Sequence, residues 1–153
     1  TIPYGKIFHF GVLNSLMHMA WVKHVCGRSK SDYRYSYEIV YTNYPWPENP
    51  PEKQIQLIEE NSQKVLDVRL HFPNSSLADL YDMLTMPPAL VKAHSEFVKA
   101  VDLAYSSQRF TSEANRMVYL FELYEKYTAD LFSKEKTKKN KKTVLPRNVS
   151  VDD

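Results

Sequence analysis

Three long stretches of the chain repeat apolar residues at intervals of three and four, which is the period of an α-helix. The stretches are residues 51–70, 87–105 and 111–132, and turns separate them. Helices of about 18–22 residues joined by turns pack side by side in antiparallel order. The pattern therefore predicts a mainly α fold built on an antiparallel helical packing unit. The residues predicted to face inward are Ile55, Ile58, Val65 and Leu66, then Leu90, Val91, His94, Phe97, Val98 and Val101, then Val118, Phe121, Tyr124, Leu131 and Phe132.

Local signals mark the ends of these helices. The first of the three is predicted to start near Pro51, with Asn49 as a candidate cap. The proline pair at 87–88 opens the second. Between them Ser76 precedes Asp79 by three residues, which is the spacing of a capping box, so a turn and a short helical segment are expected there.

A helix and a strand are predicted ahead of this unit. The stretch "GVLNSLMHMAWVKHVCG", residues 11–27, has helical spacing and ends at Gly27, the usual residue just past a helix. We interpret its apolar face as part of the hydrophobic core. The stretch from Tyr35 to Tyr41 alternates aromatic and β-branched residues with polar ones and predicts a strand that Pro45 stops. We expect one short strand or hairpin between about residues 33 and 42.

Size and composition limit the class of protein. A fold of 153 residues is large enough to bury a hydrophobic core without the support of disulfides or a structural metal. The single cysteine, Cys26, excludes an internal disulfide. A lone cysteine suits a reducing, cytoplasmic compartment. No apolar run approaches the ~18–20 residues of a membrane span, so no membrane partner is expected. The chain starts without a methionine or a signal-peptide layout, and we interpret it as a piece of a longer protein.

Charge is distributed unevenly along the chain. Residues 1–47 carry a net charge of +3, residues 48–132 carry −5, and residues 133–153 carry +4. The last segment has little apolar content and is predicted to be a basic disordered tail. Positive charge at the two ends indicates where a polyanion approaches, while the middle is acidic.

No catalytic, cofactor-binding or metal-binding set is found in the sequence. The three glycines form no phosphate-binding loop, and the five histidines are scattered, so each is interpreted as a partly buried helix residue. Nothing near Cys26 in sequence resembles a base that would activate it. We therefore expect no enzyme activity and no metal or cofactor in this stretch of chain.

One short motif resembles a catalytic loop. Asn43-Tyr44-Pro45-Trp46 is similar to the Asn-Pro-Pro-aromatic loop with which amino-methyltransferases hold a flipped adenine. Here Tyr44 replaces the first proline, and no glycine-rich strand turn for S-adenosylmethionine precedes the motif. We interpret it as a turn between a strand and a helix.

The stretch "CGRSKSDYRYSYEIVYTNYPWP" sets charged residues at every second position: Arg28, Lys30, Asp32 and Arg34, called here the charged comb. In an extended chain these four side chains share one face. Lysine donates to guanine and aspartate accepts from cytosine N4, so Lys30 and Asp32 are candidates for reading one G·C pair. Arg28 and Arg34 flank them and are candidate phosphate contacts. The alternative is that Lys30 and Asp32 form a solvated surface ion pair.

Three segments resemble a known family: "LMHMAWVKHVCGRSKSDYRYSYEIVYTNYPWP", "SSLADLYDMLTMPPALVKAH" and "FTSEANRMVYLFELYEKYTADL". They are similar to the C-terminal region of the MmeI-like restriction–modification enzymes, in which an endonuclease, an adenine N6-methyltransferase and a DNA target-recognition domain follow one another. The resemblance implies that residues 1–47 end the target-recognition domain and that 48–132 form a C-terminal helical domain. It also implies S-adenosylmethionine in the parent enzyme, double-stranded DNA and the upstream domains as partners, and Lys30 and Asp32 in the determinant for the last base pair of the site.

Two classes of function follow. The first is a sequence-reading DNA-binding module of a DNA methyltransferase, which itself neither methylates nor binds S-adenosylmethionine. The second is a structural or protein-interaction helical domain without direct base contacts. The salt dependence of binding distinguishes the two classes, because phosphate contacts weaken steeply as salt increases and apolar docking does not.

Overall fold

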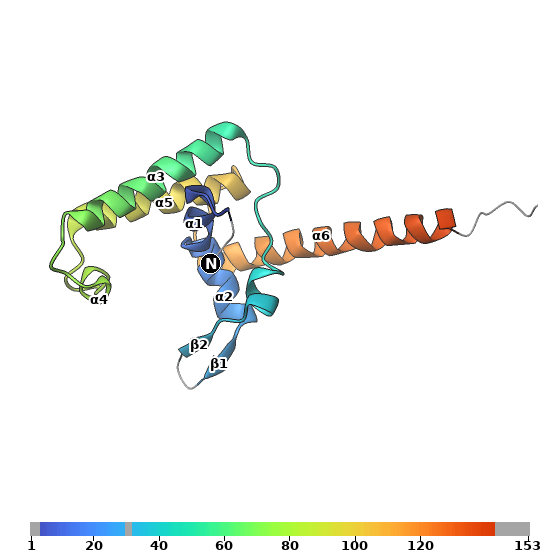
Figure 1. Cartoon of the computed structure of the whole chain (residues 1–153), viewed down its shortest axis with the longest axis horizontal. Helices are drawn as coiled ribbons and strands as arrows, with labels where there is room; N and C mark the ends of the chain where they lie inside the picture. Colours follow the sequence, from blue (N-terminus) through green and yellow to red (C-terminus); the bar gives the residue numbers. More distant parts are fainter. Residues whose placement is uncertain (1–3, 30–31, 143–153) are drawn as a thin grey trace, which may run out of the picture.

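The computed structural model describes residues 4–29 and 32–142, with the backbone alone for 28–29 and 132–142. The described chain is mainly α, as predicted (Figure 1). Its elements are α1 (Ile7–Leu13), α2 (Leu16–Val25), β1 (Gly27–Ser29), β2 (Asp32–Arg34), the π-helix η1 (Tyr37–Tyr41), α3 (Glu52–Leu70), α4 (Leu77–Leu80), α5 (Pro88–Tyr105) and α6 (Glu113–Lys142).

Helices α3 and α5 lie side by side and antiparallel, and α1 packs across them (Figure 1). Ile58 of α3, Leu90 of α5 and Val12 of α1 are fully buried in the core between these helices. Gly11 permits the close approach of α1, because a Cβ atom there would lie 2.4 Å from Ser62 Oγ and 2.7 Å from Ile58 Cγ2. The predicted antiparallel packing is confirmed for α3 and α5, but α6, which was predicted to be the third helix of this unit, packs on α2 instead.

The local signals at the helix ends are mostly confirmed. Helix α5 begins at Pro88, and Ser76 and Asp79 form the predicted capping box, in which Asp79 N–H donates to Ser76 Oγ at 3.2 Å. Asn49 does not cap α3, because the residue before its first turn is Pro51. Asn49 instead adopts a left-handed backbone conformation with φ of 44° in the connection that leads to α3.

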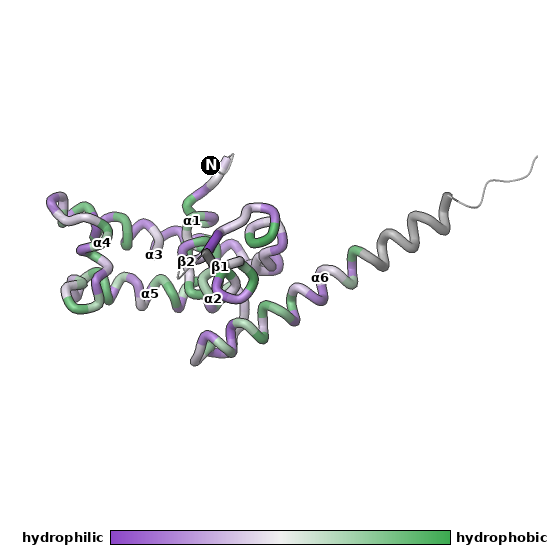
Figure 2. The backbone as a smooth tube through the Cα atoms, turned by 90° about the horizontal axis from the view of Figure 1, so that it is seen from below, coloured by the Kyte–Doolittle hydropathy of each residue, from purple (hydrophilic) through white to green (hydrophobic). Residues whose placement is uncertain are grey.

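Helix α6 differs from the prediction in length and in its buried face. It packs on α2 and projects away from the α3–α5 pair (Figures 1 and 2). The helix continues to Lys142, so the prediction of a disordered tail is wrong for residues 133–142. Residues 143–153 lie outside the described chain. Met117, Leu120 and Leu123 are buried, whereas Val118, Phe121 and Leu131, which were predicted to face inward, are exposed. Both faces carry apolar residues, so their spacing alone did not identify the buried one.

The predicted helix over residues 11–27 is two helices. The first helix, α1, ends before Asn14, whose side-chain amide donates to the Phe10 carbonyl at 2.8 Å. Ser15 then caps α2, because its hydroxyl accepts from the backbone N–H of His18 at 3.2 Å. The break leaves Leu16, which was predicted to be buried, exposed on the surface.

The strand predicted from Tyr35 to Tyr41 is wrong. The only strands in the described chain form a hairpin, β1 with β2, and Tyr37–Tyr41 form the π-helix η1. Trp21 explains the change, because its indole N–H donates to the Val40 carbonyl at 3.0 Å and Val40 is fully buried beside it. This tertiary contact with α2 overrides the β propensity of the segment.

Candidate nucleic-acid interface

The charged comb is divided between the two strands of the hairpin. The register pairs Gly27 with Arg34, Arg28 with Tyr33, and Ser29 with Asp32. Directly paired positions share a face of a hairpin. Positions 32 and 34 therefore lie on one face and position 28 on the other, so the prediction that all the charges share one face is wrong. The chain reverses direction between β1 and β2, which alternation in the sequence does not reveal. Lys30 lies outside the described residues.

The hairpin projects from the C-terminal end of α2 (Figure 1). Asp32 and Arg34 are exposed on it, and neither forms an ion pair with any side chain that the structure describes. An exposed carboxylate acceptor and an exposed guanidinium donor therefore occupy one face of a two-stranded ribbon. Such groups are suited to base edges and phosphates.

The base of the hairpin is held by His18 of α2. The Nε2 atom of His18 lies 3.2 Å from the hydroxyl of Tyr35, the residue that follows β2. The His18 ring also meets the Tyr44 ring edge to face, with centroids 4.6 Å apart. Burial lowers the pKa of His18 to about 4, so the imidazole is neutral at neutral pH.

The Asn43-Tyr44-Pro45-Trp46 motif connects η1 to α3 and serves as a turn, as interpreted from the sequence, although the element before it is not a strand. The Asn43 amide donates to the carbonyls of Glu38 and Ile39, at 3.0 Å each. Tyr44 is buried with its hydroxyl 2.6 Å from that of Tyr105, and burial raises the pKa of the Tyr44 phenol. The motif's groups are thus engaged within the fold.

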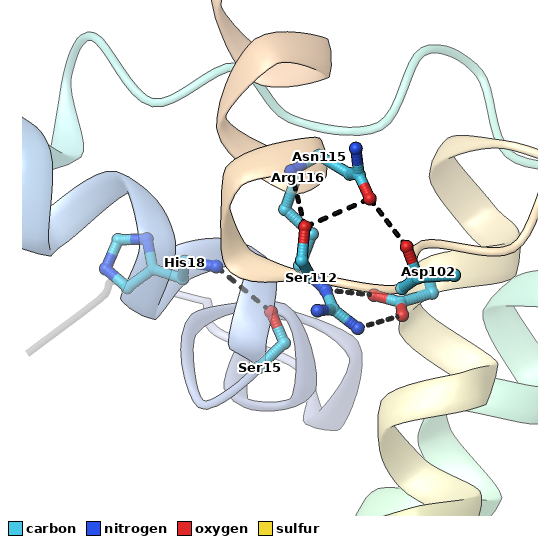
Figure 3. A network of polar contacts seen from close by, with 7 residues as sticks. Ser15, His18, Asp102, Ser112, Asn115 and Arg116 are labelled. Carbon is cyan, nitrogen blue, oxygen red and sulfur yellow. Dashed lines mark hydrogen bonds and ion pairs between the residues drawn. The ribbon is translucent and has the colours of Figure 1, made fainter.

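An ion pair that the sequence did not predict joins α5 to the start of α6. Figure 3 shows Arg116 pointing at Asp102, with Nε–Oδ1 and Nη2–Oδ2 distances of 3.1 and 2.5 Å. Both side chains are largely buried. Next to it, Ser112 donates to the Asn115 side chain at 3.0 Å. The pair forms across the turn between the helices, so no periodicity within one helix indicates it.

An open groove lies beside this ion pair. Its lining combines polar and charged residues, such as Ser95, Lys99 and Arg109, with the apolar side chains of Leu16, Val91, Val98, Leu103 and Phe110. Across the described part of the chain, no three His, Cys, Asp or Glu side chains come together in a way that could hold a metal ion. None of the described helices has the length and apolar character needed to cross a membrane.

Comparisons with known proteins define the class and then the family. Residues 1–48 match the MmeI target recognition domain and residues 50–132 match the MmeI C-terminal domain. The class is therefore a DNA target-recognition region followed by a helical C-terminal domain. The chain belongs to the MmeI family, which confirms the resemblance drawn from its sequence.

Two relatives show the extent of the match. DNA methyltransferase A of Bacillus subtilis (strain 168) is 40% identical over 124 residues, which are 81% of this chain and 14% of that protein. A solved structure of the Type IIL restriction-modification enzyme MmeI in complex with DNA matches with a TM-score of 0.78 and 45% identity, over 84% of this chain and 17% of that one. The chain thus spans less than a fifth of the length of these relatives.

Proposed function

We propose that this chain is the C-terminal DNA-recognition and helical module of a site-specific adenine N6 DNA methyltransferase of the restriction–modification type. Family membership supports the proposal, as do the two relatives, a DNA methyltransferase and a restriction-modification enzyme in complex with DNA. Methyl transfer from S-adenosylmethionine, and any DNA cleavage, then belong to other domains of the parent enzyme. Those domains and double-stranded DNA are the proposed partners.

The hairpin is the proposed reading element, and its exposed face is the observation that carries the proposal. The major groove of DNA is about 12 Å wide and admits a two-stranded β-ribbon. Asp32 begins β2 next to the point where the chain reverses, which supports its carboxylate as the proposed acceptor from a cytosine N4. Lys30, two residues earlier, is the proposed donor to the paired guanine. Arg28 and Arg34 are the proposed phosphate contacts.

The test is the preferred methylation site of variants of the intact enzyme, read by sequencing methylated DNA. Lys30→Ala and Asp32→Ala should each cost about 1–3 kcal/mol at one G·C pair and relax the preference there alone. Replacing Lys30 by an acid together with Asp32→Arg should favour the reversed pair. Arg34→Ala should instead weaken binding to all sequences and lower the salt slope by about 0.9 for each phosphate that is no longer neutralised.

The absence of these effects would favour the alternative function, a structural or protein-interaction helical domain without direct base contacts. If none of these variants changes site preference or the salt dependence of binding, the module is a structural domain.

A further inference from the structure

The contact between Tyr35 and His18 determines which way the Tyr35 hydroxyl donates. Among the described residues, His18 Nδ1 is buried and has no hydrogen-bond partner, while Nε2 faces the Tyr35 oxygen at 3.2 Å. A neutral imidazole carries one proton. A buried N–H without an acceptor is rarer than a buried acceptor without a donor. The proton therefore resides on Nε2 and is donated to Tyr35, whose own hydroxyl hydrogen stays available for another acceptor.

The position of Tyr35 on the hairpin indicates what that acceptor is. Tyr35 follows Asp32 by three residues, so along an extended chain it lies about 10 Å behind it. The major groove is about 8.5 Å deep. When Asp32 reaches a base edge, Tyr35 is level with the phosphates at the mouth of the groove. Its side chain is 47% exposed, so it remains accessible there.

We propose that the Tyr35 hydroxyl donates a hydrogen bond to a phosphate of the DNA backbone and that His18 is the positioning residue that orients this hydroxyl. The inference rests on the proposed entry of the hairpin into the major groove. Partial burial, and then the neighbouring Tyr41, raise the pKa of Tyr35, so the phenol keeps its proton at neutral pH. Because Tyr35 alternates with Arg34 along the chain, the two side chains approach the phosphates from opposite faces of the ribbon.

The first test uses the salt dependence of DNA binding by the intact enzyme. Tyr35→Phe removes one hydroxyl and keeps the ring. It should lower affinity about tenfold for every sequence, since it removes a hydrogen bond to a charged acceptor. The slope of log affinity against log salt should stay unchanged, because no cationic group is removed. Arg34→Ala, in contrast, should lower that slope. Site preference should remain that of the wild type in both variants.

The second test separates a positioning role of His18 from a purely structural one. The side-chain amide of His18→Gln can place a donor where Nε2 lies, so this variant should keep most of the DNA affinity. His18→Leu has no donor and should lose about as much affinity as Tyr35→Phe. In a Tyr35→Phe background, His18→Leu should cause no further loss of affinity, whatever it does to the melting temperature. Equal losses in both backgrounds would refute the positioning role.

Tyr81→Phe is the matched control. The Tyr81 hydroxyl also lies against a histidine, 2.6 Å from His94 Nε2, but Tyr81 ends α4 in the helical unit and does not belong to the hairpin. This variant should bind DNA normally. If Tyr35→Phe also binds normally while Asp32→Ala and Arg34→Ala show their expected effects, the phosphate contact is wrong and hairpin reading stands. If Asp32→Ala, Arg34→Ala and Tyr35→Phe all behave as wild type, both ideas are wrong.

Discussion

The chemistry of His18 depends on the fold around it. It comes from α2, is 5% exposed, and contacts both Tyr35 at the base of the hairpin and Tyr44 in the turn after η1. A protonated imidazole there would be a buried cation without a carboxylate within hydrogen-bonding reach among the described residues. Burial therefore keeps the ring neutral and couples the local structure to pH.

The stability of the chain should fall in acid through His18. The unfolded chain binds a proton on this residue near pH 6.5, but the folded chain does so only near the lowered pKa of about 4. The unfolded state thus holds more protons between these values, and the free energy of unfolding rises with pH across this window. Lowering the pH from above 6.5 to below about 4 should therefore remove roughly 3 kcal/mol of unfolding free energy.

Urea unfolding of the wild type and of His18→Gln from pH 4 to 7 measures this effect. The glutamine does not titrate, so the difference in unfolding free energy between the two proteins should change over the window by roughly that amount. A constant difference would contradict the assignment to His18. The pKa of His94 is also lowered by burial, but His94 is present in both proteins, so its contribution cancels in the difference.

Among the elements, the approach of α1 to α3 depends on a missing side chain. At Gly11 the two helices are so close that a methyl group would overlap both Ser62 and Ile58. Ser62 cannot move freely, because it is fully buried and donates to the Ile58 carbonyl at 2.6 Å. The contact thus joins the segment that ends in the hairpin to the helical unit behind it.

Gly11→Ala should destabilise the chain by about 1–3 kcal/mol, because the extra methyl group overpacks the α1–α3 contact. Gly27→Ala is the matched control, since a Cβ atom at Gly27 in β1 meets no atom within 4 Å and the backbone there has no positive φ. It should change the stability by less than about 0.5 kcal/mol. Thermal or urea unfolding measures both, and equal effects would show that α1 does not pack as described.

At the scale of the whole molecule, the two matched regions form one packed body. Helix α1 contacts α3 and α5, and α2 contacts α6. The Tyr127 hydroxyl donates to the Trp46 carbonyl at 2.8 Å, and Lys126 pairs with Glu48 at 2.6 Å. The exposed ion pair contributes at most about 1 kcal/mol, so buried apolar packing holds the regions together.

The two regions should therefore unfold in a single transition. Both tryptophans, Trp21 and Trp46, lie in the first region, whereas most of the helix is in α3, α5 and α6. Tryptophan fluorescence follows the first region and far-ultraviolet circular dichroism follows the second. The two urea transitions should coincide, as in two-state unfolding. Separate midpoints would show that the hairpin region folds independently of the helices behind it.

The sequence by itself determined the features that depend on neighbouring residues. These are the mainly α class, the helices α3 and α5 themselves, the capping box at Ser76 and Asp79, and the start of α5. Helical periodicity and capping act within a few residues of each other, so a single chain displays them directly.

Only the tertiary structure decided the features that depend on contacts far apart in the chain. Trp21 binds the Val40 carbonyl and thereby makes η1 rather than a strand, and α2 determines which apolar face of α6 is buried. The hairpin register separates position 28 from Asp32 and Arg34, which simple alternation had placed together. The His18–Tyr35 contact spans 17 residues. Each outcome is a competition between local propensity and burial against a distant partner, and no local pattern records which partner the fold supplies.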